Sequence, residues 1–171
     1  DPNTGFFLNT ARSYWSQEVD GQNVNAGGAK EVLDNSTVGR HLYVTKVTGG
    51  IHGADPADRT VASTSLTKVT DWDTIPGEDL VPAGYTPALT DDQRKDVMDW
   101  LDTSWGDPLH SEPQLVNYGY TGGDYVAAAN DPSLQKNAVF YSDNDGILHV
   151  VNAYNGKELM AVRLMGIFEV D

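Results

Sequence analysis

The chain has 171 residues, a net charge of −14 from 25 acidic against 11 basic side chains, and no cysteine. This composition excludes disulfides and thiolate–zinc chemistry, and it disfavours nucleic acid and anionic membranes because no cluster of basic residues is available to neutralise phosphates. No apolar run approaches the ~20 residues of a membrane helix. The acidity favours a solvated surface, with cation binding as the alternative.

The first part of the chain, residues 1–89, is expected to be a loop-rich segment with short strands. It opens on the turn-rich DPNTG without an initiating Met, so we expect either a processed leader or a piece of a longer protein. Residues 29–33 suffice for one helical turn. The alternating stretch 41–47 predicts a strand and residues 60–73 one more. The rest of 48–88 is expected to be irregular, which is typical of a functional segment or one that packs on something else.

Residues 90–105 predict a capped helix. Thr90 is a natural N-cap and Gln93 completes a capping box, with two aspartates in the first turn where the helix dipole favours negative charge. Val97, Met98 and Leu101 form an apolar stripe at helical spacing. A proline precedes the helix and Gly-Asp-Pro follows it, so both ends are defined.

Residues 106–171 predict an antiparallel run of strands. The turn pairs Asp145-Gly146 and Asn155-Gly156 supply the positive φ that tight hairpins need. They separate the last three of four candidate strands, at 109–120, 137–143, 147–153 and 157–164. Four consecutive antiparallel strands form one β-propeller blade. The predicted fold class is therefore mainly β: one four-stranded, quinoprotein-like blade after a loop-rich segment with one clear helix, as a fragment of a larger propeller protein.

Two short motifs suggest a serine enzyme but lack its context. Ser65 and Lys68 match S-x-x-K, and Ser142-Asp143-Asn144 matches S-D-N, both elements of β-lactamases and penicillin-binding proteins. The third element, K-T-G, is missing, and the segment around Ser65 is β-branched where that family needs a helix. Ser142–Asn144 is better explained as a strand end and a turn. We therefore predict no enzymatic activity.

The histidines and acidic pairs are the metal candidates. No histidine has ligand spacing; His149, inside a strand, is expected to be a hydrogen-bonded structural residue, and His110 to fix the backbone before the first blade strand. The pairs Asp143/Asp145 and Asp71/Asp73, the latter beside Glu78 and Asp79, are weak calcium candidates because carboxylates two apart on a loop can share an ion. Both lack the spacing and closing Glu of a calcium loop. The alternative is solvated or turn residues, so no cofactor is predicted.

The blade region resembles a known repeat. Residues 139–159, VFYSDNDGILHVVNAYNGKEL, are similar to quinoprotein-type blades of pattern V-Y-x-G-x-x-D-G-x-L-x-A-x-D-A-x-T-G-x-E, with Ser142 where Gly is common and Asn152 where Asp is common. Residues 106–116, GDPLHSEPQLV, follow a helix ending in DWL. They resemble the G-D-x-x-H-S-x-P segment that leads into the first blade of PilY-type type IV pilus tip adhesins and biogenesis factors. The matching motif residues are Gly106, Asp107, His110, Ser111 and Pro113, with Asp145, Gly146, Asn155 and Gly156 at the turns.

The N-terminal part carries the same resemblance. Residues 4–33 and 39–45 are similar to the family's F-W-S…D-G…V…G-G-A…L run and the R-x-x-Y-T that follows it, between an upstream domain and the propeller. The resemblance thus covers nearly the whole chain except 48–88. It implies an exported protein of the cell surface or pilus tip, with the periplasm or outer membrane of a Gram-negative bacterium as alternatives.

The resemblance also implies a role and partners. The role is pilus assembly, control of retraction, and adhesion. The partners are the rest of the chain's own propeller and upstream domain, pilin or minor pilin subunits, and a host or abiotic surface, without nucleic acid or a membrane span. Some family members bind Ca²⁺ deeper in the propeller, in a loop that this chain lacks. Two other functions stay open: a fragment of a quinoprotein dehydrogenase using Trp72, Trp100 and Trp105, or a carbohydrate-binding module using Trp15, Trp72 or Trp105.

Overall fold

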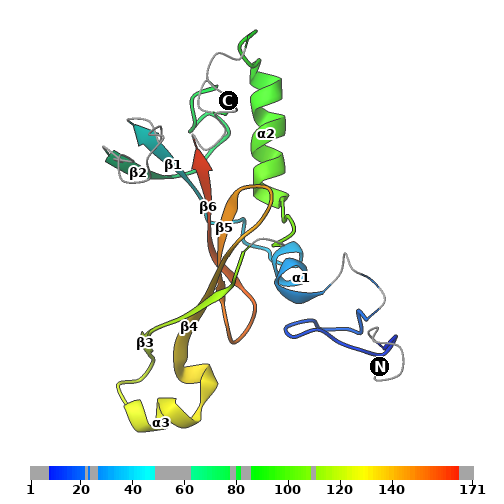
Figure 1. Ribbon diagram of the computed structural model, residues 1–171, viewed down its shortest axis with the longest axis vertical. Helices are drawn as coiled ribbons and strands as arrows, with labels where there is room; N and C mark the ends of the chain where they lie inside the picture. Colours follow the sequence, from blue (N-terminus) through cyan, green and yellow to red (C-terminus); the bar gives the residue numbers. More distant parts are fainter. Residues whose placement is uncertain are drawn as a thin grey trace.

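One six-stranded sheet forms the centre of the protein (Figure 1). The computed structural model describes residues 8–21, 23, 27–48, 63–77, 80–81, 86–108 and 111–165. The strands are β1 (Leu42–Thr48), β2 (Ser63–Lys68), β3 (Gln114–Tyr120), β4 (Gln135–Ser142), β5 (Ile147–Asn152) and β6 (Glu158–Met165). Their order across the sheet is β2-β1-β6-β5-β4-β3. The helices are α1 (Gly28–Asp34), α2 (Asp91–Thr103), α3 (Tyr125–Asn130) and the 3₁₀ turn η3 (Pro132–Leu134).

The predicted antiparallel run of four strands is confirmed. β3, β4, β5 and β6 are consecutive in the chain and each pairs antiparallel with the next. Both predicted hairpin turns have glycine in the left-handed region, Gly146 at φ 74° and Gly156 at φ 72°. The two turns predicted from the Asp-Gly and Asn-Gly pairs are therefore confirmed. Few residues other than glycine adopt this conformation without strain.

The size of the sheet corrects the predicted fold class, because the sheet has six strands rather than the four of one blade. β1 runs parallel to β6, with Leu42 opposite Ala161, and β2 pairs antiparallel with β1. Both strands were predicted in the loop-rich segment. Their place beside β6 was not, because alternating hydrophobicity marks a strand without naming its partner.

The connection between β3 and β4 contains helical structure that the sequence analysis did not predict. It contains α3 and η3, whose N-caps are Asp124 and Asp131. The Asp124 carboxylate accepts from the backbone N–H groups of Val126 and Ala127. Helices this short show no periodic hydrophobic pattern, so only their capping residues could have revealed them.

Helix α2 matches its prediction closely. Gln93 donates its backbone N–H to the Thr90 hydroxyl, and the Thr90 N–H donates to the Gln93 side chain, which completes the capping box. Met98 and Leu101 are buried, and Val97 packs beside them. The apolar stripe therefore faces the sheet, as its spacing predicted.

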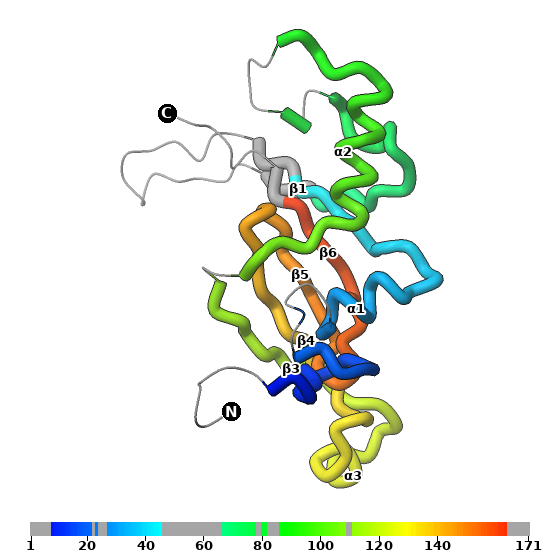
Figure 2. The backbone as a smooth tube through the Cα atoms, turned by 90° about the vertical axis from the view of Figure 1, so that its right-hand side faces the viewer, coloured from blue at the N-terminus to red at the C-terminus, as the bar shows by residue number. Residues whose placement is uncertain are grey.

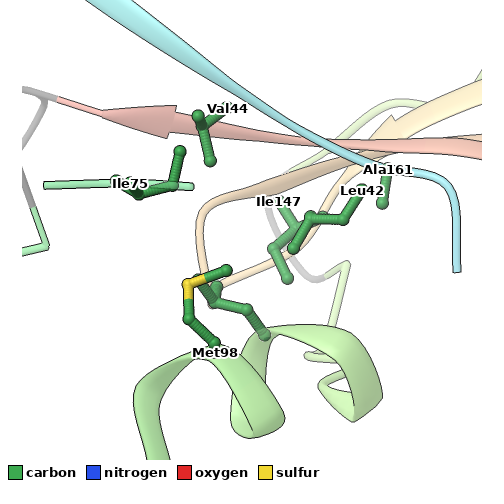
Figure 3. Packing of buried hydrophobic residues seen from close by; sticks show 7 residues of the cluster. Leu42, Val44, Ile75, Met98, Ile147 and Ala161 are labelled. Carbon is green, nitrogen blue, oxygen red and sulfur yellow. The ribbon is translucent and has the colours of Figure 1, made fainter. Parts of the chain in front are cut away.

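The main hydrophobic core lies between α2 and the sheet (Figure 3). Leu101, 2% exposed, and Ile147, fully buried, lie at its centre. The remaining buried members are Leu42, Val44, Ile75, Met98 and Ala161. Burial of a large aliphatic side chain stabilises a fold by roughly 1.5–3 kcal/mol, so this cluster fixes α2 on the sheet.

The two faces of the sheet differ. Helices α1 and α2 and the N-terminal segment lie over the same face (Figures 1 and 2). The strand register places a second apolar set on the opposite face: Val116, Ala138, Phe140, Leu148, Val150, Met160 and Val162. Within the described ranges, no helix covers this opposite face, which we call the bare face.

Candidate functional site

The loop after α2 is hydrogen-bonded to the β4–β5 turn. Gly106 donates its N–H to the Asp143 carboxylate at 2.8 Å, and Asp107 donates its N–H to the Asn144 side-chain oxygen at 2.7 Å. The Asn144 N–H donates back to the Asp107 carbonyl at 3.0 Å. A Cβ on Gly106 would lie 2.3 Å from the Asn144 oxygen. The approach of loop and turn therefore requires glycine at this position.

Two serines extend this contact. The Ser104 hydroxyl donates to the Asp145 carboxylate, and the Ser142 N–H donates to the Ser111 hydroxyl oxygen at 2.8 Å. Pro113 is exposed just before β3. The resulting turn clasp consists of residues 104–107 and Ser111 on residues 142–146. Gly106, Asp107 and Ser111 of the G-D-x-x-H-S-x-P motif thus hold the β4–β5 turn in place. His110 lies outside the described residues.

Beneath the turn clasp lies a buried charge cluster of Arg40, Asp143, His149 and Glu158. Their side chains are between 0% and 2% exposed. Arg40 binds Glu158 through two hydrogen bonds, Nε to Oε2 at 2.7 Å and Nη2 to Oε1 at 3.0 Å. His149 Nδ1 lies 2.8 Å from Glu158 Oε1, and His149 Nε2 lies 2.8 Å from Asp143 Oδ2.

A β-bulge turns Glu158 toward the cluster. His149 of β5 is opposite Ala161 of β6. Val151 lies two residues after His149, but its partner Glu158 lies three residues before Ala161. β6 thus carries one extra residue at its start. Without it, simple alternation would place Glu158 on the bare face. Bulges of this kind re-aim a side chain at a defined position, and here the bulge brings the carboxylate to His149.

Hydrogen bonding outweighs desolvation throughout the cluster. Burial opposes ionisation of Asp143 and Glu158, but hydrogen bonds from His149, and from Arg40 to Glu158, hold both carboxyl pKa values below their usual range. Burial likewise opposes protonation of His149. Hydrogen bonds to Asp143 and Glu158 overcome it and raise the pKa of His149. The cluster is therefore stable as two cations and two carboxylates.

Two aromatic rings cover the histidine. Tyr141 stacks on His149 with ring centroids 4.9 Å apart at 18°, and Trp105 packs with its centroid 4.4 Å from the imidazole. The Arg40 guanidinium lies 5.9 Å from the Trp105 ring. Burial also raises the pKa of the Tyr141 phenol. The rings reduce the access of water to the charges, which strengthens their mutual interaction.

The charge cluster joins separate parts of the chain. Arg40 Nη1 donates to the Leu101 carbonyl at 2.7 Å, which satisfies an acceptor in the last turn of α2. Arg40 precedes β1, Asp143 follows β4, and Glu158 begins β6. The cluster therefore fixes α2 and the segment before the sheet to the antiparallel strands.

The second hairpin turn contacts the N-terminal segment. Trp15, itself at φ 72°, donates its ring N–H to the Ala153 carbonyl at 3.1 Å. A Cβ on Gly156 would lie 2.6 Å from the Trp15 ring, so the indole packs directly on this glycine. Asn152 accepts from the N–H groups of Tyr154 and Asn155, and the Asn155 side chain accepts from the Lys157 N–H.

The weak calcium candidates do not meet in one place. Asp143 and Asp145 are bound by the donors of the turn clasp and by His149, which an ion would have to displace. Asp71 accepts from the Trp72 N–H, and Asp73 is exposed. Among the residues described, no three histidine or acidic side chains are grouped as metal ligands. His52, Glu78 and Asp79 lie outside the described residues.

The residues proposed for other chemistries are also dispersed. Ser65 and Lys68 lie on β2, and Ser142 ends β4, with three strands between them in the sheet. At about 4.8 Å per strand these motif halves are too far apart to share a substrate bond. Trp72 packs under Arg94 and Lys95, with the cations 5.0 and 4.8 Å from its ring centroid, and Trp100 is partly exposed on α2.

No family model, curated protein or solved structure matches this chain. No helix in the described part of the chain has the length and apolar character needed to cross a membrane. Sequence reasoning did not single out Arg40 or Glu158. Both were nevertheless fixed letters in the family patterns, the Arg of R-x-x-Y-T and the final Glu of the blade repeat. A charged residue at the edge of a predicted strand was the available indication.

Proposed function

We propose that the chain is a non-enzymatic part of a PilY-type type IV pilus tip protein, acting in pilus assembly, control of retraction, and surface adhesion. In this proposal residues 106–165 contain the first β-propeller blade. One observation carries it. Each segment that bears the family resemblance contacts the same antiparallel strands, through Trp15, through Arg40, and through Gly106-Asp107.

Convergence of the motifs supports the resemblance because chance matches have no reason to meet in space. Trp15 contacts the β5–β6 turn across 138 residues of sequence, and Arg40 reaches Glu158 across 118. Gly106 reaches the other hairpin turn. A blade whose turns are fixed by the preceding segment is a coherent unit for the start of a propeller.

The bare face supports a place in a larger assembly. Blades of a propeller pack face to face, so an isolated blade leaves apolar surface uncovered. Here the bare face carries Phe140, Leu148 and Met160, which are partly exposed, beside the buried Ala138, Val150 and Val162. At its edge, β3 is the last strand of the sheet, and its bare-face residue Val116 is 43% exposed. We expect the rest of the propeller on this face, with the upstream domain, pilin subunits and the contacted surface as further partners.

A variant of the bare face tests this proposal. In a piliated bacterium that carries the native protein, deletion of its gene should abolish surface pili and adherence, and the wild-type gene should restore both. Leu148→Glu places a charge on the bare face and should fail to restore them. Leu8→Glu, at an exposed position of the N-terminal segment on the other side of the sheet, is the matched control and should restore them. Normal pili in the deletion strain would contradict the proposed function.

The urea midpoint of each purified variant separates folding from assembly. Leu148→Glu should keep a folded chain whose midpoint is close to that of Leu8→Glu, because its side chain is only partly buried in the chain alone. Full piliation with Leu148→Glu would show that the bare face has no partner.

A further inference from the structure

Both ring nitrogens of His149 face a carboxylate oxygen. Nδ1 lies 2.8 Å from Glu158 and Nε2 lies 2.8 Å from Asp143, and the ring is fully buried. A neutral imidazole has one N–H, so one of its lone pairs would point at a carboxylate oxygen. Only the imidazolium can donate at both ends. Because the pKa values of Asp143 and Glu158 are lowered and both carboxylates are ionised, the geometry requires a proton on each nitrogen.

We propose that His149 is an imidazolium at neutral pH and acts as an alkaline-sensitive lock between the sheet, the segment around Arg40 and the turn clasp. With this proton, the charge cluster holds two cations and two carboxylates. Without it, the cluster keeps one cation, Arg40, against two carboxylates, and Asp143 and Glu158 each lose a charged hydrogen-bond donor. This inference concerns the fold and does not depend on the pilus function.

Deprotonation has a preferred site. Arg40 Nη2 lies 3.5 Å from His149 Nδ1 and can donate to it once that nitrogen has lost its proton. Nε2 faces the Asp143 carboxylate, and no donor among the described residues could replace a proton lost there, so Nε2 keeps its hydrogen. Arg40 is then shared among Glu158, the Leu101 carbonyl and the imidazole, which loosens the hold on α2.

Several other titratable groups lie near His149. The carboxyl groups of Asp143 and Glu158 have pKa values below the usual range, and burial raises the pKa of the Tyr141 phenol. Charged groups close to the cluster are Asp102 of α2, Asp145 of the β4–β5 turn, and Arg163 of β6. Desolvation raises the pKa of the Asp102 carboxyl group. His149 is thus the group of the cluster that loses its charge as pH rises through its raised pKa.

The sign of the effect follows from the raised pKa of His149. In the unfolded chain a histidine has a pKa of about 6.5. The folded chain therefore binds more protons above this pH, and the stability due to the lock falls as pH rises toward the folded pKa. In that window, the unfolding constant should rise by up to about tenfold per pH unit.

Ring nitrogen NMR on the ¹⁵N-labelled wild-type chain tests the proposal directly. At pH 7, both nitrogens of His149 should have the signature of protonated imidazolium, with assignment by loss of these signals in His149→Gln. At alkaline pH, the neutral Nε2–H tautomer should appear. One unprotonated ring nitrogen at pH 7 would overturn the proposal.

Unfolding between pH 6 and pH 9 gives a second readout. Wild type should lose stability with the slope given above, and so should His41→Gln, which changes an exposed histidine. His149→Gln should show a flat profile. If His149→Gln does not fold, the wild-type profile still decides, because constant or increasing stability over this range would contradict the lock. A wild-type slope retained in His149→Gln would assign the effect to another group.

Discussion

Replacement of Arg40 by alanine is expected to destabilise the chain by about 3–5 kcal/mol, the range found when one partner of a buried ion pair is removed. The substitution leaves Glu158 buried without its two hydrogen bonds from Arg40. It also leaves the Leu101 carbonyl at the end of α2 without the Arg40 donor. The measurement is the free energy of unfolding by urea at pH 7.

Arg12→Ala is the control for this prediction, because Arg12 is exposed and carries the same charge. It should change the free energy of unfolding by less than about 0.5 kcal/mol, as surface substitutions usually do. If Arg40→Ala and Arg12→Ala gave similar values, the charge cluster would not be what holds α2 and the first segment to the sheet.

Gly156→Ala is expected to cost roughly 2–4 kcal/mol, from left-handed strain plus a steric clash. Gly156 has φ 72°, and its added Cβ would lie 2.6 Å from the Trp15 ring. Gly123 has the same φ of 72°, but a Cβ there would meet nothing within 4 Å. Gly123→Ala therefore measures the strain alone, about 1–2 kcal/mol. Thermal or urea unfolding of both variants gives the difference.

Removal of the indole should relieve the clash but leave the strain. In a Trp15→Ala background, the cost of Gly156→Ala should fall to that of Gly123→Ala. Equal costs for the two glycine variants in the wild-type background would show that the N-terminal segment does not pack on the β5–β6 turn.

Local structure was largely predictable because its determinants are local. The capping box of Thr90 and Gln93 fixes the start of α2, and the Asp-Gly and Asn-Gly pairs fix two hairpins. Alternation marked β1 as a strand, and the turn pairs on either side marked β5. Each of these features depends on residues within a few positions of one another.

The pairing of β1 with β6 lay beyond such reasoning. It joins residues more than a hundred positions apart, Leu42 with Ala161, and a strand pattern contains no information on its neighbour. The prediction of one blade stopped at four strands for this reason. The resemblance to a propeller repeat reinforced it, because a blade is complete with four strands.

The charge cluster was half predictable. His149 was expected to be a hydrogen-bonded structural histidine, and the structure shows it buried between Asp143 and Glu158. Asp143 was expected to belong to a turn, and it does. The role of Glu158 depends on the bulge at the start of β6, which reverses the face that alternation predicts. A bulge has no reliable mark in this sequence.

The most direct test of the central claim is immunogold electron microscopy of the native bacterium, with an antibody raised against residues 1–171. A part of a pilus tip protein predicts gold at the free ends of pili and at the cell surface where pili emerge, with no label in a strain that lacks the gene. Gold confined to the cytoplasm, or absent from the ends of abundant pili, would contradict the assignment of this chain to the pilus tip.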